Sequence, residues 1–293
     1  MNALLTVLEI VAPVFLVGGV GFAWVKAGFE YRIQFVTRLG MTLAVPCLIF
    51  TALMNTQADP ATLGSLAVAG SLGYFVIGLF GWAILRLAKL DMRTYLAPLI
   101  FGNTGNLGVP LCYFAFGQTG LEAAIVMLAV SAIWSFTIGL WLVAGKGSGG
   151  KILKEPMIAA TILGALFLWL GWETPAFLTN TLDLIGQMAI PLMLITLGVA
   201  VARLTPGRIT TALWLSVLKL AVCTAVGWAV GTVFGFSGAI FGVLIIELAT
   251  PVAVTAYLLA EKYEADSNAV AGYVMVSTLT CVLGLPLILG FLL

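Results

Sequence analysis

The stretch GNTGNLGVP, residues 102–110, lies inside an otherwise apolar run. Its glycines, asparagines and threonine weaken a helix through backbone entropy and side-chain competition, and its proline lacks the N–H that continues one. In a bilayer, such a break persists only where it is buried in protein or lines a wet cavity. The stretch therefore predicts a broken transmembrane helix whose Asn103, Thr104 and Asn106 hydrogen-bond a ligand. The structural alternative is a kink stabilised by its own asparagines.

A second interrupted run, IIELATPVAVTAYLLAEKY at 245–263, carries an acidic residue beside a proline. Pro251 frees carbonyls that can coordinate a cation, and Thr250 and Thr255 lie next to it. Glu247 is several residues inside the run, where a carboxylate costs about 2.5–3.5 kcal/mol on insertion scales. We therefore expect Glu247 to carry a proton or bind Na+, as an ion-coupling residue does. A structural pairing, or a position nearer the interface, is the alternative.

The composition surrounding these breaks is that of a membrane protein. Hydrophobic residues make up 62% of the 293 and charged residues 9%, against roughly 25% charged in a soluble domain. The apolar runs match the roughly 20 residues that a helix needs to cross a bilayer. This leaves no room for a catalytic or nucleic-acid-binding domain outside the membrane, and the first run is expected to be a retained helix. We predict an all-α protein with ten spans near 4–25, 33–55, 62–86, 94–116, 120–144, 155–172, 180–202, 208–233, 239–261 and 267–292.

The basic residues orient these spans. All but one of the 13 Lys and Arg residues fall at odd-numbered connections, whereas the even connections carry acidic residues, Asp59, Glu122 and Glu173. By the positive-inside rule the odd connections are cytoplasmic and both termini lie outside. The basic residues at odd connections are Lys26, Arg32, Arg38, Arg86, Lys89, Arg93, Lys146, Lys151, Lys154, Arg203, Arg208 and Lys262.

Prolines recur at similar offsets on either side of the linker at 145–151. Pro13 corresponds to Pro156, Pro46 to Pro191 and Pro110 to Pro251, and AVPCLIFTAL at 44–53 resembles AIPLMLITLG at 189–198. Two halves, 1–145 and 152–293, would each hold five spans. An odd number of spans inverts the second half relative to the first. Inverted repeats with broken helices are typical of alternating-access transporters, whose ligand site lies where those helices meet.

The polar residues near the two breaks favour an anionic substrate. The first N–H groups of each half-helix carry a positive partial charge, and Lys219 is the one basic residue far from the cytoplasmic connections. Lys219 could pair with Glu247, attract the substrate or act in coupling. Weaker candidates are Gln187, Asp183 and Glu9. The predicted substrate-binding residues are Asn103, Thr104, Gly105, Asn106, Thr250, Val252 and Thr255, with Pro110 and Pro251 as crossover prolines.

Other chemistry finds no support in the sequence. The chain has no histidine, and its four cysteines lie inside apolar runs, so neither a histidine proton relay nor a disulfide framework is expected. The only metal site that we consider is Na+ at Glu247. We expect no organic cofactor and no enzymatic activity.

The motifs GNTGNLGVPL at 102–111 and ATPVAVTAYLLAEKY at 249–263, with VPCLIF and IPLMLITLG around Pro46 and Pro191, resemble the auxin efflux carrier family. The similarity covers essentially the whole chain and points to the bacterial branch, which includes proteins named as malonate and malate permeases. It implies a fold shared with bile-acid sodium symporters: a scaffold of spans 1, 2, 6 and 7, and a moving domain of spans 3–5 and 8–10 with crossed spans 4 and 9. Plant members differ in span 4 and in a long central loop, so auxin specificity is not expected here.

The sequence therefore predicts an elevator-type carrier of a small mono- or dicarboxylate in the cell (inner) membrane. In bile-acid symporters an acidic residue near the span 9 crossover helps to hold sodium, and Glu247 occupies a similar place. The alternatives are a sodium-coupled symporter of a bile-acid-like amphipathic anion, and a membrane sensor or channel. Apart from the substrate and the lipid bilayer, the sequence identifies no partner, and a homodimer stays open.

Overall fold

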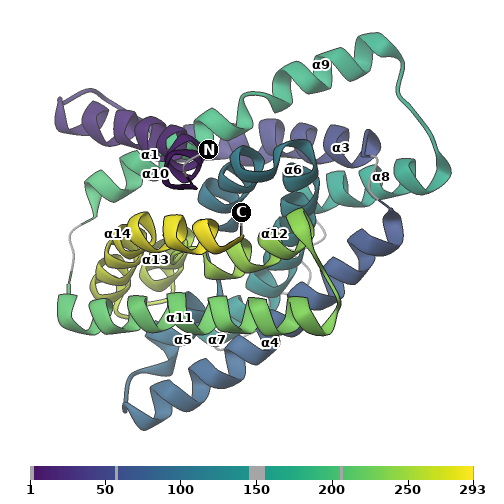
Figure 1. Cartoon of the computed structure of the whole chain (residues 1–293). Coiled ribbons are helices and arrows are strands. Elements are labelled where there is room, and N and C mark those ends of the chain that lie inside the picture. Colours follow the sequence, from purple (N-terminus) through teal and green to yellow (C-terminus); the bar gives the residue numbers. More distant parts are fainter. Residues whose placement is uncertain (1–2, 57–58, 145–155, 205–206, 293) are drawn as a thin grey trace.

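The computed structural model describes residues 3–56, 59–144, 156–204 and 207–292, and all regular elements in these ranges are helices (Figure 1). The predicted linker at 145–151 and the basic residues Lys146, Lys151 and Lys154 lie outside the described residues. Within the described part, seven helices are long and apolar enough to cross a membrane. The protein is therefore an all-helical, multi-pass membrane protein.

The first half of the chain contains the helix interrupted at residues 101–103. The described elements before the linker are α1 (Ala3–Lys26), α2 (Ile33–Leu39), the π-helical stretch η1 (Gly40–Ala44), α3 (Val45–Met54), α4 (Pro60–Leu87), α5 (Met92–Ile100), the π-helical stretch η2 (Thr104–Gly108), α6 (Val109–Trp134), the π-helical stretch η3 (Ser135–Gly139) and α7 (Leu140–Ala144).

The second half contains the helix interrupted at residues 250–253. Its described elements are α8 (Pro156–Leu170), α9 (Ala176–Gly186), α10 (Ala189–Arg203), α11 (Ile209–Val233), α12 (Gly238–Ala249), α13 (Val254–Lys262) and α14 (Ser267–Leu292). Both predicted breaks are therefore present in the structure.

Three details differ from the sequence prediction. The gap expected after residue 116 is a kink inside α6, where Gly117 adopts φ 63° and ψ −145°, a conformation open to glycine because it has no Cβ. The single helix expected over 180–202 is two helices, α9 and α10, separated at Gln187 and Met188. Glu122, assigned to a connection, is buried in α6, where its carboxylate accepts a hydrogen bond from the Thr56 hydroxyl.

Helix ends are set by local sequence signals. Asp59 and Asp91 cap α4 and α5, because each side chain accepts hydrogen bonds from two backbone N–H groups in the first turn. Lys89, after α4, and Glu264, after α13, have φ of 54° and 55°. Each residue lies in a turn closed by the backbone hydrogen bond typical of a Schellman motif. The Leu90 N–H donates to the Leu85 carbonyl at 3.0 Å, and the Ala265 N–H donates to the Ala260 carbonyl at 2.9 Å. Two charged residues thus occupy positions where glycine is usual.

Packing divides the helices into two groups. α1 packs along α10, and α3 packs against α8 and α9, whereas α11 packs against α12 and α14, and α6 against α4 and α12 (Figure 1). The α1–α10 pair is close because small residues line it: a Cβ on Gly198 would lie 1.7 Å from the Gly18 carbonyl oxygen, and one on Gly21 would lie 2.1 Å from that of Ile195. The two interrupted helices belong to the second group.

Candidate functional site

The two chain breaks lie directly against each other. Gly102 and Val252 form an antiparallel bridge, and the Asn103 N–H donates to the Pro251 carbonyl at 2.7 Å. A Cβ on Gly102 would lie 2.0 Å from the Thr250 hydroxyl oxygen and 2.9 Å from the Thr250 carbonyl oxygen, so only glycine allows this approach. We call residues 101–104 and 250–253, which form this contact, the crossing.

The crossing presents hydrogen-bond donors. η2 begins at Thr104, directly after Asn103, and α13 begins at Val254. The first N–H groups of a helix have no partner within the helix and carry a positive partial charge. Asn103 is 5% exposed, and its side-chain Nδ2 has no hydrogen-bond partner among the described residues. A buried amide donor beside a helix N-terminus suits an anionic group.

Side chains satisfy three carbonyl groups near the ends of the half-helices that stop at the crossing. Lys219 on α11 is 2% exposed, and its Nζ donates to the Leu99 carbonyl in the last turn of α5 at 2.7 Å. The Thr250 hydroxyl donates to the Glu247 carbonyl at 2.8 Å, and the Cys281 thiol donates to that of Ala249 at 3.6 Å. Because the interior of a bilayer offers no water to these carbonyl groups, the three side chains supply their hydrogen bonds. Lys219 is therefore a cationic cap on the negative end of α5.

Glu247 lies behind the crossing, with 0% of its side chain exposed. A Cβ on Gly108 would lie 2.4 Å from its Oε2, so the carboxyl packs on the η2 backbone. Its Oε1 is 3.8 Å from the Cys112 sulfur, and its Oε2 has no hydrogen-bond partner among the described residues. The sequence left open a pairing of Lys219 with Glu247, and in the structure no ion pair joins these two described residues. The reason is that Lys219 is used at α5.

A cavity of about 550 Å³ adjoins the crossing. Asn106 of η2 and Thr255 of α13 line it on one side, and α2 and α10 form the other side. Its charged lining residues are Arg38 of α2 and Arg203 of α10, and no acidic side chain is among the described lining residues. Cavities of this size commonly hold small-molecule ligands. The cavity therefore places positive charge beside Asn106 and Thr255, which follow the crossing closely in η2 and α13.

Two residues that line this cavity, Arg203 and Thr196, hold the connection between α1 and α2 through hydrogen bonds to Tyr31. The Arg203 guanidinium donates from Nη2 to the Tyr31 carbonyl at 2.6 Å, and the Tyr31 hydroxyl lies 2.8 Å from the Thr196 hydroxyl, which lines the cavity. Burial raises the pKa of the Tyr31 hydroxyl above its usual value, against the opposing effects of Thr196 and Arg203. Tyr31 therefore stays protonated at neutral pH and holds the α1–α2 connection against α10.

The weaker sequence candidates lie elsewhere. Asp183 and Gln187 line a second cavity, of about 410 Å³, which also includes Thr51 of α3 and Gln118 of α6. Glu9 is exposed on α1. None of the three reaches the crossing.

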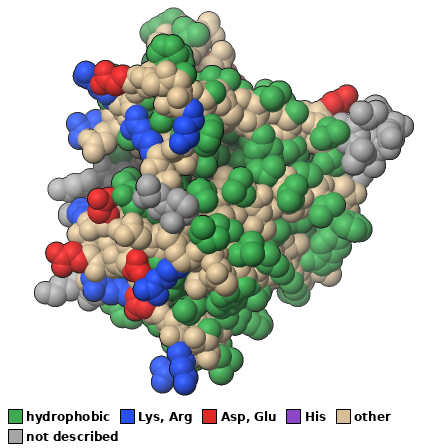
Figure 2. Space-filling view, turned by 90° about the vertical axis from the view of Figure 1, so that its left-hand side faces the viewer, with side chains coloured by type: hydrophobic (Ala, Val, Ile, Leu, Met, Phe, Trp, Pro, Cys, Tyr) green, Lys and Arg blue, Asp and Glu red, His purple; other side chains and the backbone are tan. Residues whose placement is uncertain are grey.

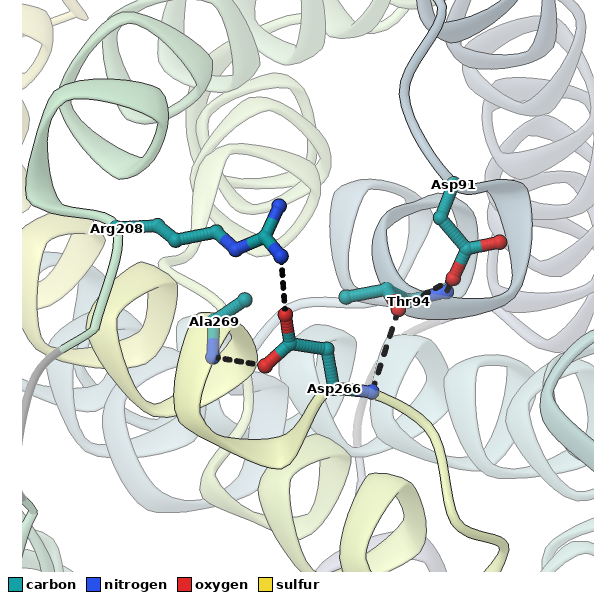
Figure 3. A network of polar contacts seen from close by, with 5 residues as sticks. All are labelled: Asp91, Thr94, Arg208, Asp266 and Ala269. Carbon is teal, nitrogen blue, oxygen red and sulfur yellow. Dashed lines mark hydrogen bonds and ion pairs between the residues drawn. The ribbon is translucent and has the colours of Figure 1, made fainter.

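A polar network joins the starts of α5, α11 and α14 (Figure 3). Asp266 accepts from the Ala269 N–H at 3.0 Å and pairs with Arg208 at 3.1 Å, and its own N–H lies 3.4 Å from the Thr94 hydroxyl. Asp91 caps α5 through Thr94. This network holds helices of the second packing group together at one end.

Arg93, at the start of α5, links three helices. Its Nε donates to the Val143 carbonyl near the end of α7 at 2.7 Å, and its Nη2 donates to the Tyr263 carbonyl after α13. One guanidinium thus satisfies carbonyls at two helix C-termini, where cations are favourable. α5 and α13, the outer halves of the interrupted helices, are thereby joined at the ends away from the crossing.

The structure brings together most of the predicted site. Of the predicted residues, Asn103, Thr104, Thr250, Val252 and Pro251 form the crossing, and Gly105 and Pro110 follow it in η2 and α6. Asn106 and Thr255 face the cavity, and Glu247 and Lys219 lie buried behind the crossing. Two hydrogen-bonding groups are already engaged: the Thr250 hydroxyl donates to the Glu247 carbonyl, and the Val252 N–H donates to the Ser277 hydroxyl oxygen at 3.0 Å.

Sequence reasoning missed the arginines of the cavity. In the sequence, Arg38 and Arg203 stand out only as part of the basic pattern that orients the spans. The available signal was the position of Arg38, which lies five residues inside the span predicted at 33–55 rather than beyond its end. Thr196, within the repeat motif at 189–198, was also missed, because a threonine in an apolar helix carries no distinguishing pattern.

Comparison with known proteins gives consistent matches. Residues 6–155 and 150–289 match the family described as "Membrane transport protein". An "Uncharacterized transporter" of Methanothermobacter thermautotrophicus is 29% identical over 86% of each chain, and one of Methanocaldococcus jannaschii is 22% identical over 85% of this chain and 86% of its own. A protein of Rhizobium meliloti named "Putative malonate transporter" is 26% identical over 55% of each chain.

Proposed function

The chain belongs to the membrane transport protein family, and on this premise we propose that it is a secondary active transporter of a small organic anion, a mono- or dicarboxylate. Its relatives are transporters rather than enzymes. The substrate would cross the cytoplasmic membrane by an elevator-type alternating-access mechanism coupled to H+ or Na+. The name of the Rhizobium meliloti relative supports an organic acid as the substrate class.

The proposed topology has ten spans in two inverted halves with both termini outside. Gly117 divides the long helical stretch Thr104–Ala144, and α8 and the α12–α13 pair add shorter apolar segments to the seven long ones. In Figure 2 most Lys and Arg side chains gather toward one side of the molecule, while hydrophobic side chains cover the other. This distribution supports a single cytoplasmic face.

The two packing groups support a division into a scaffold and a moving domain. The group of α1, α2, α3, α8, α9 and α10 corresponds to spans 1, 2, 6 and 7, and the remaining helices correspond to spans 3–5 and 8–10. The cavity with Arg38 and Arg203 lies between the groups. Arg93 and the network of Figure 3 join helices within the second group, as a domain that moves as one body requires.

One observation carries the proposal. The buried Asn103 amide donor has no partner among the described residues, and it lies at the N-terminus of a half-helix at the crossing. Leaving such a donor unsatisfied costs about 1–3 kcal/mol. A bound carboxylate would satisfy it together with the first N–H groups of η2, and the charge of Lys219 adds to the attraction. A cation would be repelled by the same groups.

The direct test is uptake of radiolabelled carboxylates into proteoliposomes under separate Na+ and pH gradients. We expect saturable uptake that one of the two gradients accelerates. Asn103→Leu should weaken apparent affinity about tenfold or more, because a charged hydrogen bond is lost. Unaltered uptake in Asn103→Leu would remove the crossing from the site, and large unitary currents in planar bilayers would make the protein a channel.

Glu247→Gln separates binding from coupling. Because Glu247 is fully buried behind the crossing, its neutral analogue should keep substrate exchange while losing the dependence on the driving ion gradient. Retained gradient-driven accumulation in Glu247→Gln would rule out its coupling role. Thermal shift with each carboxylate checks that the variant still binds.

A further inference from the structure

The second cavity, of about 410 Å³, lies between the two packing groups, as the first one does. Its lining comes from α3, α9 and α10 in the first group and from α6 in the second. In the proposed topology α3 ends at an outer connection, whereas α2 begins after a cytoplasmic one. The second cavity therefore lies toward the outside, and the first cavity lies toward the cytoplasm.

The sequence repeat relates the two cavities to each other. Thr51 and Thr196 each lie five residues after the proline of the repeated motif, and Thr51 lines the second cavity while Thr196 lines the first. The same offset of 145 residues separates Arg38 in the first cavity from Asp183 in the second. Inverted halves would place such equivalent positions toward opposite sides of the membrane. This correspondence supports the second cavity as the counterpart of the first.

A buried hydrogen bond joins the two packing groups at the edge of the second cavity. The hydroxyl of Thr56, just after α3, donates to the carboxylate of Glu122 on α6, and the two residues are 6% and 5% exposed. Their neighbours in the sequence, Asn55 and Leu121, line the cavity. The other side-chain bonds described above each lie within one packing group, whereas this bond spans both.

We propose that Thr56 and Glu122 form a latch that holds the two packing groups in the present arrangement and keeps the second cavity closed toward the outside. This inference rests on the proposed function and assigns two residues to the control of its movement. Burial makes loss of the hydrogen bond costly while the cavity is closed. Once the cavity opens, water can take the place of the Thr56 hydroxyl, so the latch can break and form again in each transport cycle.

Labelling of a residue in the cavity tests the latch without any substrate. Ala52 lines the second cavity and is 4% exposed, so in the Ala52→Cys variant a membrane-impermeant maleimide should react slowly from the outside. Adding Thr56→Val, which keeps the shape of threonine but removes the donor, should raise the labelling rate about tenfold. Adding Thr56→Ser instead keeps the hydroxyl and should leave the rate close to that of Ala52→Cys alone.

Thr161→Val is the matched control. The Thr161 hydroxyl donates to the Met157 carbonyl of its own helix, α8, at 2.9 Å, so this variant removes a hydroxyl without a contact between the packing groups. It should leave the labelling of Ala52→Cys unchanged. Glu122→Gln keeps a neutral and weaker acceptor, so it should raise the rate less than Thr56→Val does. It replaces Thr56→Val if that variant does not fold.

Cross-linking tests whether the contact must open during transport. The double variant Thr56→Cys/Glu122→Cys is treated with a short bis-methanethiosulfonate reagent, whose link a reductant cleaves. The link should stop uptake of radiolabelled malonate or succinate into proteoliposomes, and reduction should restore it. Each single variant, treated in the same way, should keep its uptake.

The outcomes separate the latch from the proposed function. Unchanged labelling in both Thr56→Val and Glu122→Gln, an equal rise in Thr161→Val, or undiminished uptake by the cross-linked protein would overturn the latch while leaving anion transport intact. Failure of wild-type protein to transport any carboxylate would instead overturn the proposed function.

Discussion

Gly102 has a hydrogen atom as its side chain at the point where two backbones meet. An added Cβ would lie 2.0 Å from the Thr250 hydroxyl oxygen, which itself bonds the Glu247 carbonyl. We expect Gly102→Ala to lower stability by about 1–3 kcal/mol through overpacking, and to abolish transport because the bridge to Val252 separates. Thermal unfolding in detergent and proteoliposome uptake measure the two effects.

Gly19→Ala provides the control for this change. Gly19 lies in α1, and an added Cβ there would meet nothing within 4 Å. It should leave stability unchanged or slightly higher, because alanine favours a helix more than glycine does. Equal behaviour of the two alanine variants would contradict the close backbone approach at the crossing.

At the scale of the elements, two helix ends are strained because a residue with a Cβ adopts a positive φ there. Lys89 and Glu264 adopt the left-handed conformation at the ends of α4 and α13. Lys89→Gly and Glu264→Gly should each raise the free energy of unfolding by up to about 1 kcal/mol, since glycine adopts this conformation without a Cβ clash. Alanine at the same positions removes the charge but keeps the strain. A rise in Tm for both glycine and alanine variants would assign the effect to charge instead.

Arg93 joins the outer ends of α5, α7 and α13. Arg93→Gln should leave the Val143 and Tyr263 carbonyls with weaker partners and let these helix ends open more often. Hydrogen exchange should increase in 139–144 and 258–265, while α1 and α10 stay unchanged. Arg86→Gln serves as the control, because Arg86 stacks on Trp82 instead of capping a helix. Exchange that rises equally in both variants would contradict a specific clamp.

Some of these features can be predicted from the sequence and others cannot, for physical reasons. The breaks at 102–110 and near Pro251 were predictable because glycine, asparagine and proline disrupt helices locally. The crossing of the two broken spans is predicted only through the repeat and the resemblance, since no local signal encodes a contact between residues about 150 positions apart, and the antiparallel bridge itself is not predicted. The partner of Lys219 was not predictable, because a backbone carbonyl leaves no mark in the sequence. The same holds for Arg38 and Arg203, whose common cavity arises from the packing of α2 against α10.

For the whole molecule, the topology makes a labelling prediction. The four cysteines are buried, so background labelling by a membrane-impermeant maleimide should be low. In the Lys89→Cys variant the maleimide should react only from the cytoplasmic side, and in the Glu173→Cys variant only from the outside. Labelling of both from the same side would contradict the ten-span, inverted arrangement.

The central claim is that the crossing binds an organic anion and moves it across the membrane. Counterflow tests it most directly: proteoliposomes loaded with unlabelled malonate or succinate are diluted into a trace of the labelled acid. Wild-type protein should accumulate label transiently above equilibrium, and Asn103→Leu, folded by thermal shift, should do so much less. Absence of any overshoot in wild-type protein, or an equal overshoot in Asn103→Leu, would contradict the claim.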